Sequence, residues 1–173
     1  MGFGRRGDAN QEPLNIIEAV EGLSDGDRWA CMLPLGQRSL SEPAVKAQID
    51  RLAASAKWYP RKLALMACFA SRDKAIILSC LTDASGAIAA VASGLAMSSL
   101  DDAALIDGLP ALPKRRLKML AKSCAKHHRT AVAEAVFDHL DGDGQVALAS
   151  AVSSEFLSKR LEGDFAERLS ATD

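Results

Sequence analysis

Short apolar runs alternate with turn residues along most of the chain. Apolar positions recur at three- and four-residue spacing in segments such as "AVAEAVFDHL", residues 131–140, which is typical of an α-helix with one buried face. No segment shows the sustained two-residue alternation of a half-buried strand. The run "AIILSCL", residues 75–81, fits a strand or a buried helix by periodicity alone, and its neighbours favour a helix. We therefore predict an all-α fold.

Helix boundaries recur at close intervals and define two interleaved series. The predicted starts lie near Pro60, Gly86, Pro113 and Gly144 and, in the second series, near Pro43, Asp73, Asp101 and Arg129. Successive members of a series are about 26 to 31 residues apart. Such spacing predicts three or four helical hairpins in tandem, because each hairpin is too small to bury its apolar face alone.

Side-chain caps are expected at several of these starts. Ser39 and Glu42 have the spacing of a capping box, and Ser41 before Glu42 offers a competing N-cap. Ser71 and Ser99 are expected to cap the helices that follow them. Towards the C-terminus we expect one helix over residues 145–161 and a last short helix over 164–170.

From Ser41 to Leu161 the chain resembles the HEAT and armadillo class of α-solenoids. The resemblance rests on the "A-x-x-x-L"-like apolar rhythm and on short helices capped by Asp or Ser. It implies antiparallel hairpins stacked as a short α-solenoid, and a scaffold whose partner is a protein or, sometimes, a nucleic acid. A compact helical bundle is the alternative architecture. Some DNA-repair glycosylases are also built on HEAT-like repeats, but no motif here matches theirs.

Length and composition fit a single globular domain. The chain has 173 residues, of which 49% are apolar and 25% are charged. We expect a polar, Gly-rich, flexible leader over residues 1–12 and a single all-helical repeat domain over 13–173. The uncharged stretch 84–100 is expected to form a central helix buried on all sides. A membrane span is not expected, because the stretch is short and rich in Ala, Ser and Gly.

The cysteines bear on the compartment. They are Cys31, Cys68, Cys80 and Cys124. Each lies in an apolar stretch and none belongs to a C-x-x-C pair, so we interpret them as reduced core thiols rather than as a disulfide framework or a metal site. No apolar core of a signal peptide follows Arg5 and Arg6. These observations predict a cytoplasmic protein.

One segment stands out chemically: "LPKRRLKMLAKSCAKHHRTA", residues 112–131. It holds four lysines, three arginines and two histidines, and no acid lies between Asp107 and Glu134. We name residues 113–129 the basic helix. On a helical wheel its apolar stripe consists of Leu117, Leu120, Ala121, Cys124 and His128. The opposite side carries the candidate partner-binding residues Arg115, Lys118, Lys122, Lys126 and Arg129.

Lys118, Lys122 and Lys126 form an i, i+4, i+8 series, here called the lysine ladder. Like charges at this spacing disfavour a helix, so a compensating interaction is expected. The helix dipole supplies one at the C-terminal end, and the acids at positions 101, 102 and 107 supply another. A bound polyanion is the third. Because the first two need nothing outside the chain, we favour a solvated or internally paired face, followed by a site for an acidic protein and then for nucleic acid or anionic lipid.

The loop "HLDGDGQVALAS", residues 139–150, resembles the calcium loop of an EF-hand. Asp141, Asp143 and Gly144 match positions three, five and six of that loop. His139 and Ser150 stand where the first aspartate and the bidentate glutamate are needed, so we do not expect calcium. A Gly-rich turn, with Asp143 capping the next helix, explains the same residues.

No catalytic signature is present, and we expect neither enzymatic activity nor a cofactor. The chain lacks a nucleophile elbow, a phosphate-binding glycine loop and a His-Glu metal helix. His127 and His128 are adjacent and point about 100° apart on a helix, which argues against a shared metal. Trp58 is expected to be a packing anchor or, if exposed, a hot spot for a partner. The function predicted is a non-enzymatic scaffold module that binds a protein, with nucleic-acid binding as the alternative and no membrane partner.

Overall fold

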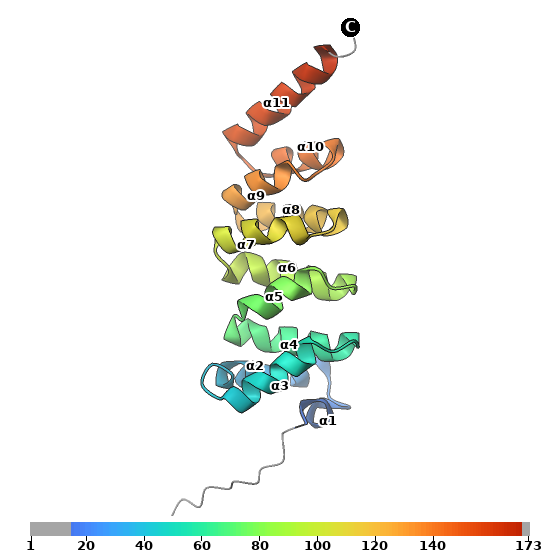
Figure 1. Ribbon diagram of the computed structural model, residues 1–173, viewed down its shortest axis with the longest axis vertical. Helices are drawn as coiled ribbons and strands as arrows, with labels where there is room; N and C mark the ends of the chain where they lie inside the picture. Colours follow the sequence, from blue (N-terminus) through green and yellow to red (C-terminus); the bar gives the residue numbers. More distant parts are fainter. Residues whose placement is uncertain (1–14, 171–173) are drawn as a thin grey trace, which may run out of the picture. The chain divides into compact units, whose positions relative to one another are not determined.

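The chain is helical throughout the part that the structure describes. The computed structural model describes residues 15–170, with side chains over 15–163, and this part contains eleven α-helices, one 3-10 turn and no strand (Figure 1). The all-α prediction is confirmed. The leader predicted over residues 1–12 lies outside the described residues.

The chain divides into two compact units, one ending at Ser71 and the other beginning at Arg72. The prediction of one domain over 13–173 stays a prediction. The helices of the first unit are α1 (Ile16–Val20), α2 (Asp25–Arg38), α3 (Pro43–Ala53) and α4 (Trp58–Ser71). Helix α4 packs against both α2 and α3.

A glycine permits the close packing of α2 on α4. Gly36 is buried, and a Cβ placed on it would lie 2.0 Å from the carbonyl oxygen of Ala67. Only a residue without a side chain allows the two backbones to approach so closely. Beside this contact, the rings of Trp29 and Phe69 pack edge to face with centroids 4.8 Å apart.

The second unit is built from consecutive helical hairpins. Its helices are α5 (Lys74–Leu81), α6 (Gly86–Ser99), α7 (Asp102–Gly108), η1 (Leu109–Ala111), α8 (Lys114–His127), α9 (Thr130–Phe137), α10 (Gly142–Ala151) and α11 (Glu155–Ser170). Helix α6 packs on α5 and α8, while α8 packs on α9 and α10 (Figure 1). Helices α6, α8 and α10 therefore form a continuous row.

The helix starts keep one constant period. Helices α5, α7 and α9 begin at residues 74, 102 and 130, and α4, α6, α8 and α10 begin at 58, 86, 114 and 142. Each step within a series is 28 residues. The two predicted interleaved series are confirmed, and the predicted spacing of about 26 to 31 residues narrows to a single value.

Several predicted caps are wrong. Asp73, not Ser71, caps α5 by accepting the N–H of Ile76 at 3.1 Å. Ser71 still belongs to α4, which ends where Arg72 adopts a left-handed conformation with φ 55°. In the next hairpin the cap is Asp101, directly before α7, and not Ser99.

The predicted capping box before α3 does not form. Helix α3 begins at Pro43, as expected, but its N-cap residue Glu42 makes no side-chain cap hydrogen bond. The Glu42 carboxylate instead pairs with Arg38 at 2.7 Å, near the end of α2. The Oγ of Ser39 donates to the Gly36 carbonyl at 2.6 Å. Ser39 and Glu42 are therefore occupied by the preceding helix.

The predicted helix over 145–161 is also wrong. Helix α10 starts earlier, at Gly142, with Asp141 and not Asp143 as its cap, and it ends at Ala151. Val152 is extended, and the Oγ of Ser154 accepts the N–H of Leu157 at 3.3 Å, which starts α11. A serine cap inside the apolar rhythm thus separates two helices that periodicity alone joins.

Helix α6 is not buried on all sides, contrary to the prediction for residues 84–100. Ile88, Ala92 and Leu95 are buried, but Ala90 and Val91 are exposed. No helix in the described part of the chain is both long and apolar enough to cross a bilayer.

The cysteines differ in exposure. Cys31 is exposed, contrary to the prediction that it lies in the core, whereas Cys68, Cys80 and Cys124 are buried. None of the four forms a disulfide bond.

Candidate binding surface on helix α8

Helix α8 presents the basic segment with its apolar stripe inward. Leu117, Leu120, Ala121 and Cys124 are buried as predicted. Pro113 is the N-cap residue rather than the first residue of the helix. His128 does not join the buried stripe, because it follows the helix in a left-handed conformation, φ 54°, and is exposed.

The lysine ladder lies on the exposed face of α8. Lys118, Lys122 and Lys126 are all exposed. Within the part of the chain that the structure describes, Lys122 and Lys126 form no ion pair, and the same holds for Arg115 at the N-terminal end of this face. Their charges are therefore available to a partner.

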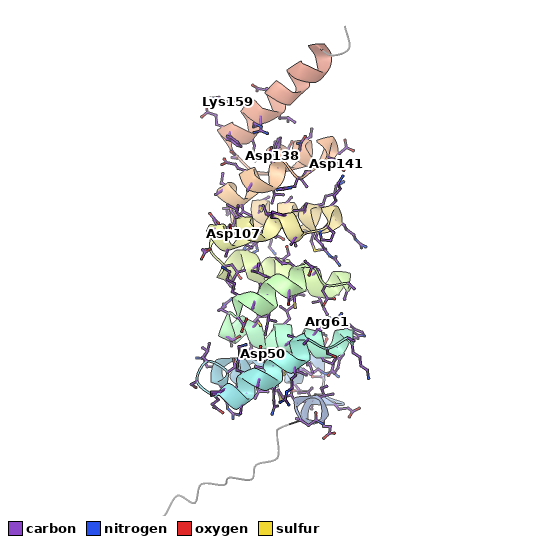
Figure 2. All side chains as sticks on the ribbon, viewed as in Figure 1. Asp50, Arg61, Asp107, Asp138, Asp141 and Lys159 are labelled. Atoms are coloured by element: carbon purple, nitrogen blue, oxygen red, sulfur yellow. The ribbon has the colours of Figure 1, made fainter. Side chains whose placement is uncertain are left out.

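Lys118 is the one ladder residue with an ionic partner among the described residues. Its Nζ lies 2.6 Å from Oδ2 of Asp141, the N-cap of α10 at the start of that helix (Figure 2). Hydrogen bonds from Lys118 and from the Gly144 N–H hold the pKa of the Asp141 carboxyl below its usual value. Both side chains are about half exposed, so solvent screens the pair and its contribution to stability is small. The acids at 101, 102 and 107, named as partners from the sequence, do not pair with the ladder.

Arg129 has a different position from the other predicted residues. Its Nε donates to Oδ1 of Asp102 at 2.6 Å, its Nη1 to the carbonyl of Met97 at 2.5 Å and its Nη2 to the carbonyl of Leu100 at 2.9 Å. The side chain is only 19% exposed. Arg129 therefore ties the start of α9 to the last carbonyls of α6 and the start of α7, and the proposals below leave it out of the binding surface.

An apolar groove runs between α8 and α10 beside the ladder. It has a volume of about 250 Å³. Its floor is formed by Ala121, Leu140, Ala147, Leu148 and Ala151, with Gly144 beside them. Lys118 and Lys122 line it from α8, and Asp143 lines it from α10. Apolar floor and cationic edge are thus adjacent, and sequence reasoning had identified only the edge.

On the other side of the ladder, α6 presents small side chains. In the 28-residue period, Ala90 and Gly94 of α6 hold the positions of Lys118 and Lys122 of α8. A Cβ on Gly94 would meet no atom within 4 Å, which shows that this part of the face is open. The ladder therefore rises next to a low, uncharged surface.

The loop that resembles an EF-hand serves to start a helix. Oδ1 of Asp141 accepts the Gly144 N–H at 3.0 Å, and its other oxygen binds Lys118. Across the described residues, no cluster of three or more His, Cys, Asp or Glu side chains could hold a metal ion.

In the first unit, Trp58 is 56% exposed and contacts Tyr59 edge to face, with ring centroids 5.8 Å apart. It fits the hot-spot alternative better than that of a packing anchor.

The chain matches no protein-family model, no curated protein and no solved structure. The candidate surface is therefore defined by its geometry alone.

Proposed function

We propose that the protein is a non-enzymatic helical-repeat scaffold of the HEAT and armadillo type, which binds another protein through α8 and the groove beside it. One observation carries the proposal: exposed lysines without ionic partners stand at the edge of an apolar groove. Protein interfaces combine an apolar centre with a charged rim in this way.

The 28-residue period supports the repeat class. Each period contains two helices whose starts keep the same spacing through successive hairpins. Contacts within the second unit join each helix of the α6, α8, α10 row to the next. Arrays of this kind bury a core between neighbouring repeats and leave one helix row open as a binding face.

The groove favours an acidic amphipathic helix over nucleic acid as partner. Such a helix places apolar anchors in the groove and carboxylates against Lys118 and Lys122. Nucleic-acid backbones need cations but no apolar groove, and single-strand binders add aromatic platforms. Helices α6, α8 and α10 contain no Phe, Tyr or Trp. Nucleic acid remains the second candidate, supported by the ladder alone.

Two variants separate the candidates. Lys118→Glu/Lys122→Glu/Lys126→Glu reverses the ladder, and Ala147→Glu places a charge in the groove. Ser150→Glu, on the exposed side of the same helix outside the groove, is the matched control. Circular dichroism establishes that each variant is folded.

Fluorescence anisotropy then measures binding of three labelled probes: a helical peptide of Leu and Glu at i, i+3 and i+4 spacing, a DNA duplex and a DNA single strand. A protein site predicts that the peptide loses at least tenfold in affinity with the ladder variant and with Ala147→Glu, but not with Ser150→Glu. A nucleic-acid site predicts steep salt dependence and a loss with the ladder variant alone. If no probe binds at low salt, the α8 surface is not the binding site.

A further inference from the structure

The N-terminus of α6 lies beside two arginines of α8. Gly86 is the first residue of α6. A Cβ placed on it would lie 3.8 Å from Nη1 of Arg116 and 3.9 Å from Nη2 of Arg115. Two guanidinium groups therefore meet at the positive end of a 14-residue helix.

This helix end has no side-chain cap. Ser85 is the N-cap residue but makes no cap hydrogen bond, and the first turn contains no acid. Helices α5, α7 and α10 are each capped by an aspartate instead. Among the described residues, the N–H groups of Gly86 and Ala87 have no acceptor. Asp83 accepts the Ser85 N–H at 2.7 Å and supplies one negative charge near two arginines and the helix dipole.

Arg116 independently indicates a missing anion. The residue is only 8% exposed, and its Nη2 donates to the carbonyls of Asp83 and Ala84. Its Nη1, close to Gly86, has no hydrogen-bond partner and is shielded from solvent. A buried guanidinium N–H without an acceptor is costly, and an oxyanion at the α6 N-terminus would supply one.

We propose that Arg115, Arg116 and the first amides of α6 form a binding site for a phosphate-type oxyanion. Phosphate has more acceptor oxygens than a carboxylate, and it matches a forked guanidinium and backbone amides at a helix N-terminus. Arg115 is exposed and has no partner among the described residues, so it rotates aside to admit the anion to Nη1 and then closes on it. The site does not depend on the proposed protein partner, because the lysine ladder and the groove contribute no group to it.

Inorganic phosphate is the probe for the first experiment. Thermal unfolding is followed in phosphate and in chloride at equal ionic strength and pH, and calorimetry measures the affinity. We expect phosphate to raise the Tm of the wild type relative to chloride, and Arg115→Gln to weaken phosphate binding at least tenfold. The ladder variant is expected to keep its response to phosphate, so failure of this site and failure of the proposed function are distinguishable. O-phosphoserine, compared with free phosphate, shows whether the site accepts a monoester.

A second experiment supplies the anion from within the chain. There is room for a Cβ at Gly86, so Gly86→Asp places a carboxylate between the two arginines, and Gly86→Asn is its neutral control. We expect Gly86→Asp to have a higher Tm than Gly86→Asn and to abolish the phosphate response. This Asp–Asn difference should shrink in an Arg115→Gln background. A phosphate response that equals that of chloride, or that survives both Arg115→Gln and Gly86→Asp, overturns the proposal.

Discussion

Gly36 gives the sharpest prediction for stability. In Gly36→Ala the new Cβ would start 2.0 Å from the Ala67 carbonyl oxygen and 2.8 Å from its carbonyl carbon. Both are backbone atoms and cannot rotate away, so α2 and α4 must separate by about 1 Å or more to restore van der Waals contact. Overpacking of this kind costs about 1–3 kcal/mol. Alanine returns at most about 1 kcal/mol through helix propensity, and less here, because Gly36 is two residues from the end of α2.

Gly94 provides the matched control. It lies inside α6, and a Cβ there would meet no atom within 4 Å. Gly94→Ala is therefore expected to stabilise the protein by about 0.5–1 kcal/mol through helix propensity alone. The same chemical change thus has opposite signs at the two positions.

Urea unfolding measures both changes. Trp29 and Trp58 are the only tryptophans and both belong to the first unit, so their fluorescence reports on the unit that contains Gly36. Circular dichroism follows the helices of both units. A Gly36→Ala variant as stable as the wild type, or a Gly94→Ala variant that is less stable, would refute the packing argument.

Three further predictions concern single side chains. Arg129→Met is expected to destabilise the protein by about 2 kcal/mol in urea unfolding, because a carboxylate and two carbonyls lose a charged donor; Arg129→Lys should restore little, since an ammonium cannot span all three. Asp141→Ala should lower the Tm near neutral pH, and the difference from wild type should disappear on acidification, because the folded-state pKa of Asp141 is lowered and its contribution is lost as the pH falls through that pKa. With a thiol reagent at pH 8 and mass-spectrometric mapping, Cys31 should label first; Cys124 should resist, because burial raises its pKa to about 12.

The hairpin arrangement follows largely from the sequence. Pro43 and the turn residues near 86 and 113 mark helix starts closely, because they act on the local backbone. The caps were harder to assign, since Ser71 and Asp73 are both good N-caps and the choice depends on where α4 stops. The break at Val152 was missed because an apolar residue in the correct rhythm carries no sign of an extended conformation.

The candidate surface was only half predictable. The helical wheel placed the ladder on the exposed side of α8, because that requires only helix periodicity. Arg129 was misplaced on that side, since its interactions with Met97, Leu100 and Asp102 depend on how hairpins pack together. The groove and the pairing of Lys118 with Asp141 likewise arise only where α8 meets α10.

The constant period determines which changes of length the chain tolerates. Removing residues 101–128 joins Leu100 to Arg129 and brings together segments that already occupy equivalent positions, whereas removing one residue fewer or more rotates every later helix by about 100°. Insertions and deletions during evolution are therefore expected in whole multiples of 28 residues. The ladder belongs to a single period, because Ala90 and Val146 occupy the position of Lys118 in the neighbouring ones. Binding specificity is thus carried by one interchangeable segment, and it can be gained or lost by recombination without redesign of the core.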